Sequence, residues 1–532
     1  MTSPSTQPVV SGGQAAGAGS RRGEARRAGF DAGPRWMMAL PPVVTFVIML
    51  WGITGASYWR DEAATMSAVQ RPLGNLLQTL GNIDAVHGAY YLLIWVVVRL
   101  GGTGELVTRF PSALAMAGAA AAVAALGRRL ISPRAGLASG LVFAVLPEVS
   151  LYGQEARSYA IVVALAALAS YLLVRAMQAD RGARRRWLTG YAVGLAALGI
   201  VNIFGLLLIP AHAVTVALRY LHSDDTDGAA GAGEAAGADG VAGVAGAGGS
   251  RADRSLVLGW LAAAGAGIAA ASPLLVLGYV QRGTHPWLVR PGLRAVEGLR
   301  QLVGPALMVD GVVLVIAAGI VVSALGGRER LRANWPGSVT ALCLPWLILP
   351  PAILVIGSQL TPLYTFRYVL FCMPAIALLA GAGLAALGWV AGTAALVVVT
   401  VLGLPAQLQV RGPDGHGDNV RQADRIVARN LRPGDAVLEF KAENFAQAYP
   451  YGIRQLIPIA QAKTPIQSAT LVGTFLPDPV VRQRLTGVSR VWVVEYGHPT
   501  PLVILSGLHF TLVRAWRTSD IWLYLYAHAG SG

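Results

Sequence analysis

The chain has 532 residues, of which 54% are hydrophobic and only 13% are charged, and its mean hydropathy is +0.54. Several apolar runs approach the ~20 residues that cross a bilayer as a helix, so the composition excludes a soluble globular protein and predicts an α-helical polytopic membrane protein. The net charge of +15 comes almost wholly from arginine, because Lys441 and Lys463 are the only lysines. These arginines cluster between apolar runs without interleaved aromatic residues, which favours membrane lipids as partners and excludes nucleic acid.

The first 35 residues are rich in Ser, Gly, Ala and Arg and have no apolar periodicity. This composition predicts a disordered cytoplasmic tail over 1–35. The arginines at 21–27 favour a cytoplasmic location for this end of the chain, and the first apolar run, 37–56, is predicted to be an uncleaved membrane anchor.

The apolar segment 90–100 decides the topology, because it fits either a second span or a helix lying along the outer surface. If it spanned the membrane, the arginines after the next apolar run (Arg128, Arg129 and Arg134) would lie outside, as would those at 181–186. A surface helix over 87–101 places both groups inside, as the positive-inside rule requires. We therefore predict one outer loop, 57–109, that contains surface helices.

The remaining apolar runs bring the prediction to about eleven spans within a membrane domain over 36–404. A low-complexity Ala- and Gly-rich segment, 222–254, is predicted to be an unfolded cytoplasmic loop. The further spans are expected at 110–126, 135–151, 159–177, a hairpin within 187–220 that turns near Asn202, 255–280, 305–325, 337–356, 366–387 and 390–404.

From residue 405 the apolar runs shorten and alternate with polar residues. Asp418 is predicted to cap a helix that runs to about Asn430, and an RPGD turn then precedes a strand at 436–440. Further strands are expected at 491–496, 510–516 and 521–526. This pattern predicts a small extracytoplasmic α/β domain over 405–532. Cys343 and Cys372 lie inside apolar segments and are expected to be free and buried.

The adjacent carboxylates Asp61 and Glu62 follow the first predicted span directly. Ionisable groups close to a membrane are costly and usually have a function or a partner. Asp61 is a candidate general base that draws a proton from an attacking hydroxyl, although Asp is also a good cap for a surface helix. Glu62 is a second catalytic candidate that orients Asp61 or binds an acceptor, and the alternative is a solvated or ion-paired side chain.

Asp84, His87 and Tyr91 are spaced by three and four residues, so they can share one helical face. They are candidate contacts to a polar substrate, while an ordinary interfacial histidine is the structural alternative for His87. A divalent ion held by Asp61, Asp84 and His87 can be imagined, but no spacing demands it.

Arg109, Arg157 and Arg367 each stand at the predicted outer end of a span. A guanidinium fork can make two parallel hydrogen bonds to phosphate oxygens, so these residues are candidate ligands of a lipid phosphate, and snorkelling to the interface is the alternative. Tyr368 is expected to pack against lipid or sugar. Glu155 is a candidate for acceptor binding or for pairing with an arginine, and His285 with Trp287 is a candidate gate.

The order of the motifs RDEA, DAVHGAYYLL, RFPSAL, QEARSYA and FRYVLFCMP resembles that of the polytopic GT-C-type glycosyltransferases that use lipid-phosphate sugars. The likeness is strongest to the branch of protein mannosyltransferases and lipid A aminoarabinose transferases. The chain departs from that branch at Gly88 and Ala89, where a His-Pro-Pro-Leu motif commonly has its prolines.

This resemblance implies transfer of a sugar from a polyprenyl-phosphate donor to a hydroxyl of an acceptor glycan, lipid or protein on the outer face of the plasma membrane. It implies mannose as the sugar, inversion at the anomeric carbon, and Asp61 as the base. The sugar or its acceptor is then expected to contact Asp84, His87, Tyr91 and Glu155. Two alternatives are a lipid or polysaccharide transporter, which would need repeated halves with broken helices, and a noncatalytic scaffold of the cell envelope.

Overall fold

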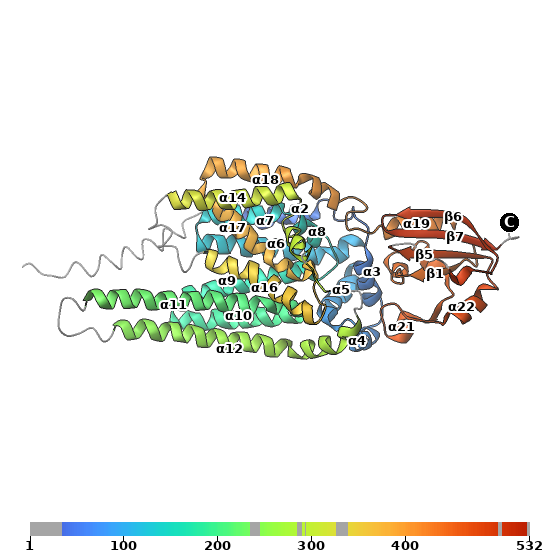
Figure 1. The fold of residues 1–532 in the computed structure, drawn as a ribbon, viewed down its shortest axis with the longest axis horizontal. Helices are drawn as coiled ribbons and strands as arrows, with labels where there is room; N and C mark the ends of the chain where they lie inside the picture. The colour runs from blue at the N-terminus through green and yellow to red at the C-terminus, as the bar shows by residue number, and fades with distance from the viewer. Residues whose placement is uncertain are drawn as a thin grey trace, which may run out of the picture.

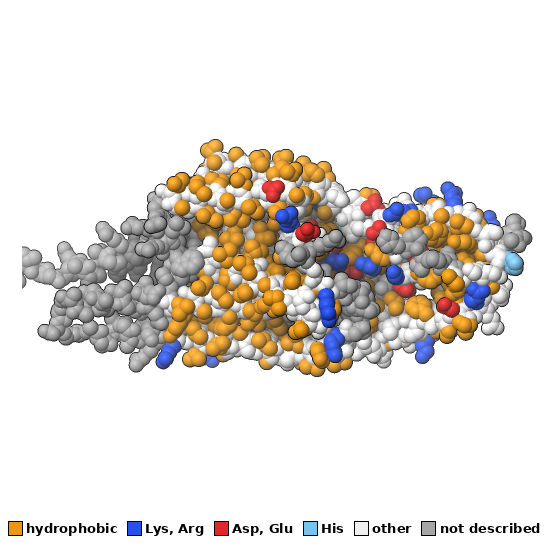
Figure 2. All heavy atoms as spheres, in the orientation of Figure 1, with side chains coloured by type: hydrophobic (Ala, Val, Ile, Leu, Met, Phe, Trp, Pro, Cys, Tyr) orange, Lys and Arg blue, Asp and Glu red, His pale blue; other side chains and the backbone are white. Residues whose placement is uncertain are grey.

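The computed structural model of the protein describes residues 34–234, 245–284, 290–292, 294–325, 339–497 and 503–528. The molecule is elongated, with a bundle of long helices at one end, a β-sheet domain at the other, and short helices between them (Figure 1). On the face drawn in Figure 2, hydrophobic side chains cover most of the bundle, and most charged side chains lie at the junction or on the sheet domain. This distribution is the one expected of a bundle embedded in lipid.

Eight helical segments of the described chain are long and apolar enough to cross a membrane, or nine if the bent pair α7–α8 is one span. The protein is therefore a polytopic membrane protein, as predicted. The two other predicted spans coincide with α2, which has only 15 residues, and with α10, which begins with an arginine-rich turn. The bundle consists of α2 (Trp36–Leu50), α6 (Glu105–Leu130), α7 (Pro133–Val145), α8 (Pro147–Gly153), α9 (Tyr159–Gln178), α10 (Arg181–Val201), α11 (Leu208–Glu234), α12 (Ala245–Val280), α14 (Ala306–Leu325), α16 (Val339–Leu360), α17 (Met373–Ala386) and α18 (Trp389–Val410).

Short 3-10 segments and breaks shape the bundle. The chain bends by 64° between α7 and α8, where Pro147 has no N–H to continue the helical ladder. The predicted hairpin is confirmed: Asn202 ends α10, and its side chain accepts a hydrogen bond from the Phe204 N–H at 2.9 Å. The short segments are η2 (Ile203–Leu207), η3 (Gln281–Thr284), α13 (Arg294–Arg300) and η4 (Phe366–Cys372).

The low-complexity segment 222–254 departs from its prediction. α11 continues to Glu234 and α12 already begins at Ala245, so the described parts of this segment are helical. Alanine is the strongest helix former, and its frequency here outweighs the flexibility expected from glycine. Residues 235–244 and almost all of the predicted tail 1–35 lie outside the described residues.

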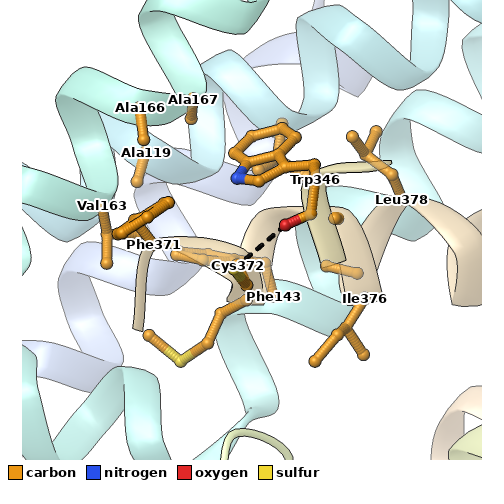
Figure 3. Close-up of a cluster of buried hydrophobic side chains, with 14 of the residues drawn as sticks. Ala119, Phe143, Val163, Ala166, Ala167, Trp346, Phe371, Cys372, Ile376 and Leu378 are labelled. Atoms are coloured by element: carbon orange, nitrogen blue, oxygen red, sulfur yellow. Dashed lines mark hydrogen bonds between the residues drawn. The ribbon is translucent and has the colours of Figure 1, made fainter. Parts of the chain in front are cut away.

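The core of the bundle combines aromatic and small side chains (Figure 3). Trp346, Phe143 and Phe371 are fully or almost fully buried against alanines of α6 and α9. Small residues let helix backbones approach closely, which is how membrane helices gain packing energy. Cys343 and Cys372 are free and buried, as predicted.

Four short elements connect α2 to α6: α3 (Arg60–Val69), α4 (Leu73–Asn82), η1 (Ala85–His87) and α5 (Gly88–Gly101). α5 is the helix predicted at 87–101, and it is too short to count as a span. One face of α5 is buried through Tyr90, Tyr91 and Ile94, while Leu93 and Val96 are exposed on the other. These elements lie between the bundle and the sheet domain (Figure 1).

The C-terminal domain contains a five-stranded sheet of order β2-β1-β5-β7-β6. β1 pairs in parallel with β2 and β5, and β7 pairs antiparallel with β5 and β6. All four predicted strands are confirmed. The elements are α19 (Val420–Asn430), β1 (Ala436–Phe440), α20 (Phe445–Ala448), η5 (Ile453–Gln455), β2 (Ile457–Pro458), β3 (Gln461–Lys463), α21 (Pro465–Ser468), β4 (Thr474–Phe475), α22 (Asp478–Leu485), β5 (Arg490–Tyr496), η6 (Val503–Leu505), β6 (Phe510–Thr518) and β7 (Ile521–His528).

The prediction that Asp418 caps α19 is wrong by one residue. Asn419 is the cap, and its side-chain oxygen accepts a hydrogen bond from the Gln422 N–H at 3.0 Å. Asp418 instead accepts a hydrogen bond from the Arg60 N–H at 2.9 Å, because the C-terminal domain is packed against α3. One hydrophobic cluster unites side chains of α3, α5, α19, α20 and the sheet. The domain therefore fixes the position of α3.

Candidate active site

Asp61 lies in the first turn of α3 and keeps part of its side chain accessible, with 27% exposed. Its Oδ2 accepts a hydrogen bond from NH1 of Arg367 at 2.8 Å, although the two residues are 306 positions apart in the chain. Arg367 comes from η4, which leads into α17, and its guanidinium also lies over the Trp59 ring at 4.6 Å. The structure thus joins two of the predicted site residues in one accessible ion pair.

Arg157 approaches the same place from the linker between α8 and α9. Its NH1 donates to the backbone carbonyl of Asp61 and to the Tyr91 hydroxyl, both at 3.4 Å, and its NH2 lies 3.2 Å from Nε2 of His87. The Arg157 Nε is buried and makes no hydrogen bond within the described chain. Arg157 therefore links Asp61 to the predicted sugar-binding residues.

Asp84, His87 and Tyr91 are brought together, but not as one helical face. Asp84 stands before the helix in a left-handed conformation with φ +63°, and from there its carboxylate accepts a hydrogen bond from the Tyr91 hydroxyl at 2.5 Å. The Asp84 Oδ1 is 3.9 Å from Nε2 of His87. Burial and the Asp84 carboxylate raise the pKa of the Tyr91 hydroxyl, which therefore remains a hydrogen-bond donor.

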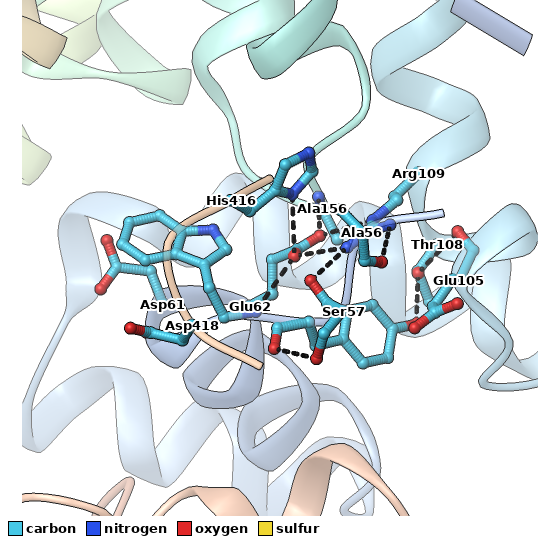
Figure 4. Close-up of polar contacts among 12 residues, drawn as sticks. Ala56, Ser57, Asp61, Glu62, Glu105, Thr108, Arg109, Ala156, His416 and Asp418 are labelled. Atoms are coloured by element: carbon cyan, nitrogen blue, oxygen red, sulfur yellow. Dashed lines mark hydrogen bonds and ion pairs between the residues drawn. The ribbon is translucent and has the colours of Figure 1, made fainter. Parts of the chain in front are cut away.

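Glu62 lies beside Asp61 in sequence but points into a closed cluster (Figure 4). Its side chain is fully buried, and both of its oxygens accept hydrogen bonds from Arg109, at 2.9 Å from Nε and 2.8 Å from NH2. The Ala156 N–H adds a third hydrogen bond at 2.7 Å. Although burial opposes ionisation, the Arg109 guanidinium lowers the pKa of Glu62 to about 2.

Arg109 is also fully buried, and every N–H donor of its guanidinium has a protein acceptor. Besides Glu62, it donates to the carbonyls of Ile53, Ala56 and Ser57 at 2.8–3.1 Å. No donor remains for a phosphate in this structure. The geometry therefore argues for a structural role of Glu62 and Arg109, which ties α6 to the turn before α3.

His416 escaped the sequence analysis, and Asp418 was predicted only as a helix cap. Nδ1 of His416 lies 3.6 Å from Oε2 of Glu62, and both side chains are buried. Burial lowers the pKa of His416, so its ring is neutral beside the ion pair. Asp418 follows two residues later and holds the Arg60 N–H at the start of α3. Both residues lie in a turn after α18, and no local pattern indicates that this turn contacts residue 62.

Glu155 and Tyr368 line the bundle side of this region. Glu155 is buried, its Oε2 has no hydrogen bond within the described residues, and burial raises the pKa of its carboxyl group. The Tyr368 ring stacks on Phe204 with centroids 4.3 Å apart. The candidate gate formed by His285 and Trp287 lies outside the described residues.

The suggested metal ligands Asp61, Asp84 and His87 do not form a cation site. Within the described ranges there is no group of three or more His, Cys, Asp or Glu side chains arranged to hold a metal ion. Asp61 is paired with Arg367, and Arg157 donates to the Asp61 backbone and contacts His87. A cationic guanidinium at this point would repel a divalent ion.

The chain was compared with known families and structures. Residues 88–222 match the family model described as dolichyl-phosphate-mannose-protein mannosyltransferase. This segment contains Tyr91, Arg109 and Arg157 but not Asp61 or Arg367. No curated protein is significantly similar to the chain in sequence.

Two crystal structures of ArnT from Cupriavidus metallidurans share the fold. The apo form superposes with a TM-score of 0.59 at 14% sequence identity, over 92% of this chain and 97% of that one. The form bound to undecaprenyl phosphate superposes with a TM-score of 0.55 at 15% identity, over 93% and 98% of the two chains. The predicted fold class is therefore confirmed, and the family match over 88–222 agrees with the resemblance to glycosyltransferases that use lipid-phosphate sugars.

Proposed function

We propose that this polytopic membrane protein is a glycosyltransferase that moves a sugar from a polyprenyl-phosphate donor to an acceptor hydroxyl, with Asp61 as the general base. The family model over 88–222 and the ArnT-like fold support the reaction class. The undecaprenyl phosphate in one ArnT structure supports the donor class. Mannose is the proposed sugar because the matching family model is that of mannosyltransferases.

The ion pair between Asp61 and Arg367 is the observation that carries this proposal. Both side chains are 27% exposed, so an acceptor and a donor headgroup can reach them. Nε and NH2 of Arg367 make no hydrogen bond within the described chain and are free to donate to phosphate oxygens. A base and a phosphate ligand thus lie in one accessible site, as a transfer from a sugar phosphate requires.

The proposed reaction is a single displacement. The acceptor hydroxyl loses its proton to the Asp61 carboxylate while its oxygen forms a bond to the anomeric carbon. The bond between that carbon and the phosphate oxygen breaks, and the lipid phosphate leaves with the electron pair. Arg367 and Arg157 stabilise the negative charge that builds on the phosphate. Attack opposite the leaving group inverts the anomeric centre.

The other candidate residues receive revised roles. We assign Glu62 and Arg109 to positioning, because their buried pair fixes the start of α3 and hence Asp61. Asp84, His87 and Tyr91 remain the proposed contacts to sugar or acceptor. Glu155, with a buried oxygen that lacks a hydrogen bond, is a further proposed contact, and Tyr368 is proposed to pack against the donor.

We further propose that the site faces outward and the N-terminus faces the cytoplasm. Arg109 lies at the site end of α6, and Arg128 and Arg129 lie at its other end, roughly 30 Å away at 1.5 Å per residue. The positive-inside rule assigns that arginine-rich end to the cytoplasm. The division into a tail over 1–35, a membrane domain over 36–404 and an extracytoplasmic domain over 405–532 follows from the same assignment.

The direct test incubates the purified protein with labelled polyprenyl-phosphate sugars, mannose included, and a membrane extract, and then identifies the labelled product. Asp61→Asn should abolish transfer while donor binding persists, and Asp478→Asn, which changes an exposed residue of the C-terminal domain, should leave transfer intact. Absence of transfer from every lipid-linked sugar would refute the proposal. Full turnover by Asp61→Asn would refute the role of Asp61 as the base, whereas absent transfer would favour a transporter or scaffold.

A further inference from the structure

A cavity with several polar side chains in its walls lies outside the candidate active site, between α3 and the C-terminal domain. Its volume is about 300 Å³. Ser67 and Gln70 at the end of α3 form one wall, and Glu439, Glu443 and Arg454 of the domain form the other. α4 and α21 lie side by side near this region (Figure 1), and the Asn75 side chain of α4 donates to the Ile466 carbonyl of α21 at 2.8 Å. Val437 and Glu439 of β1 and Pro458 of the parallel strand β2 also line the cavity.

Glu439 has a carboxyl oxygen in this cavity that lacks a hydrogen bond within the described chain. Its Oε1 is buried and has no hydrogen bond within the described residues. Burial, with the Glu443 carboxylate nearby, raises the pKa of Glu439 to about 8. At neutral pH the carboxyl group is therefore protonated, so that it can donate one hydrogen bond and accept others. Such a group matches a hydroxyl, which also donates and accepts.

The basic residues at the cavity argue against a phosphate ligand. Arg71 is committed to the protein, since its Nε donates to the Ser67 carbonyl at 2.8 Å and its NH1 to the Thr79 hydroxyl at 2.8 Å and the Thr470 carbonyl at 3.0 Å. Arg454 contacts the Gln70 side chain at 3.4 Å. Arg71 is already bonded, and the Glu443 carboxylate opposes the charge of Arg454 in the same lining, whereas amide, carboxyl and guanidinium groups together suit a neutral polyhydroxyl ligand.

We propose that this cavity binds a neutral sugar unit of the acceptor glycan, a role that rests on the proposed transferase function. Gln70 and Asp61 are nine positions apart along α3 and its cap, so the cavity lies roughly 13 Å from the catalytic carboxylate at 1.5 Å per residue. The transferred sugar cannot occupy both places. A sugar unit further along the acceptor can, and it would hold the C-terminal domain against the helix that carries Asp61.

The test measures binding of methyl α-mannoside, methyl α-glucoside and methyl β-galactoside by saturation-transfer NMR. The full chain is placed in phosphatidylcholine nanodiscs, so that no detergent sugar competes. At least one glycoside should bind saturably, and both Glu439→Leu and Ala446→Phe, which fills the cavity, should weaken that binding at least about tenfold. Gln483→Leu, an apolar change on the exposed side of α22, should bind like the unmodified protein.

Two variants guard against misfolding and against confusion with catalysis. Glu439→Gln keeps the shape of the side chain and should lose less affinity than Glu439→Leu. Asp478→Asn should bind the glycosides normally, and because the assay requires neither donor nor turnover, a failure of catalysis cannot affect it. Binding that survives both cavity variants, no binding of any glycoside, or binding of inorganic phosphate in their place would overturn the inference, whatever the transfer assay shows. Glycoside binding through Glu439 would support a saccharide site even if transfer failed.

Discussion

The amide substitutions Asp61→Asn and Glu62→Gln should affect different properties. Asp61 is partly exposed, so its loss should reduce activity, whereas Glu62 is buried, so its loss should reduce stability. Asp61→Asn removes one ion pair whose side chains are 27% exposed, so the free energy of unfolding should change by no more than about 1 kcal/mol. Activity should nevertheless fall by roughly 10²–10⁴-fold, the usual contribution of a general base.

Glu62→Gln should instead destabilise the protein. The side chain is fully buried, and the substitution leaves the buried Arg109 guanidinium without a counter-charge. Breaking a buried pair by removing one partner typically costs about 3–5 kcal/mol, and the retained amide oxygen should keep the loss near the lower value. The double variant Glu62→Gln/Arg109→Met should recover part of the loss, with a coupling energy of about 1–3 kcal/mol.

The assay is the apparent melting temperature of each variant in detergent, measured beside its transfer rate. Glu62→Gln should lower the melting temperature by roughly 5 °C or more, and Asp61→Asn should leave it nearly unchanged. Equal destabilisation by both amides would contradict the assignment of Asp61 to chemistry. A Glu62→Gln variant as stable as the unmodified protein would show that the cluster around Arg109 does not fix α3.

Three further outcomes follow from the same geometry. Arg367→Ala should lower turnover by about 10²–10³-fold, the usual effect of losing one hydrogen bond to a developing negative charge. The KM for the polyprenyl-phosphate sugar should also rise. Unchanged kinetics with this substrate would contradict the phosphate role of Arg367. Folding lowers the pKa of Glu62 from 4.5 to about 2, so ionised Glu62 stabilises the folded protein fully above pH 4.5. This stabilisation should be lost as the pH falls from 4.5 toward 2, and melting curves across that range would show the loss. Glu439 has a folded-state pKa raised from 4.5 to about 8, so it costs stability progressively between those values, and Glu439→Gln should raise the melting temperature at pH 8 but hardly at pH 5; an equal effect at both pH values would argue against a protonated Glu439.

Local sequence patterns were sufficient for the spans and the main strands but not for the Ala- and Gly-rich segment 222–254, whose described parts are helical. Apolar run length located the spans, the polar Asn202 marked the turn of the hairpin, and alternation located strands such as Ala436–Phe440. These signals arise within one element and its immediate neighbours, so they can be recognised without knowledge of the fold. The cap of α19 was displaced by one residue because Asp418 and Asn419 both suit that position, and only packing against α3 chose between them.

The candidate site was predictable in its residue types but not in its pairings. Motif order brought forward Asp61, Glu62, Arg109 and Arg367, yet it could not say which carboxylate is buried or which arginine is fully bonded. Those outcomes depend on contacts between distant positions: Arg109 meets Glu62 from 47 residues away, and Arg367 meets Asp61 from 306. The sequence by itself therefore determined a membrane bundle that carries acids and arginines near one face. Only the tertiary structure decided which of these charges neutralise each other in the interior and which remain open to a ligand, because burial and pairing are properties of packed neighbours rather than of the chain.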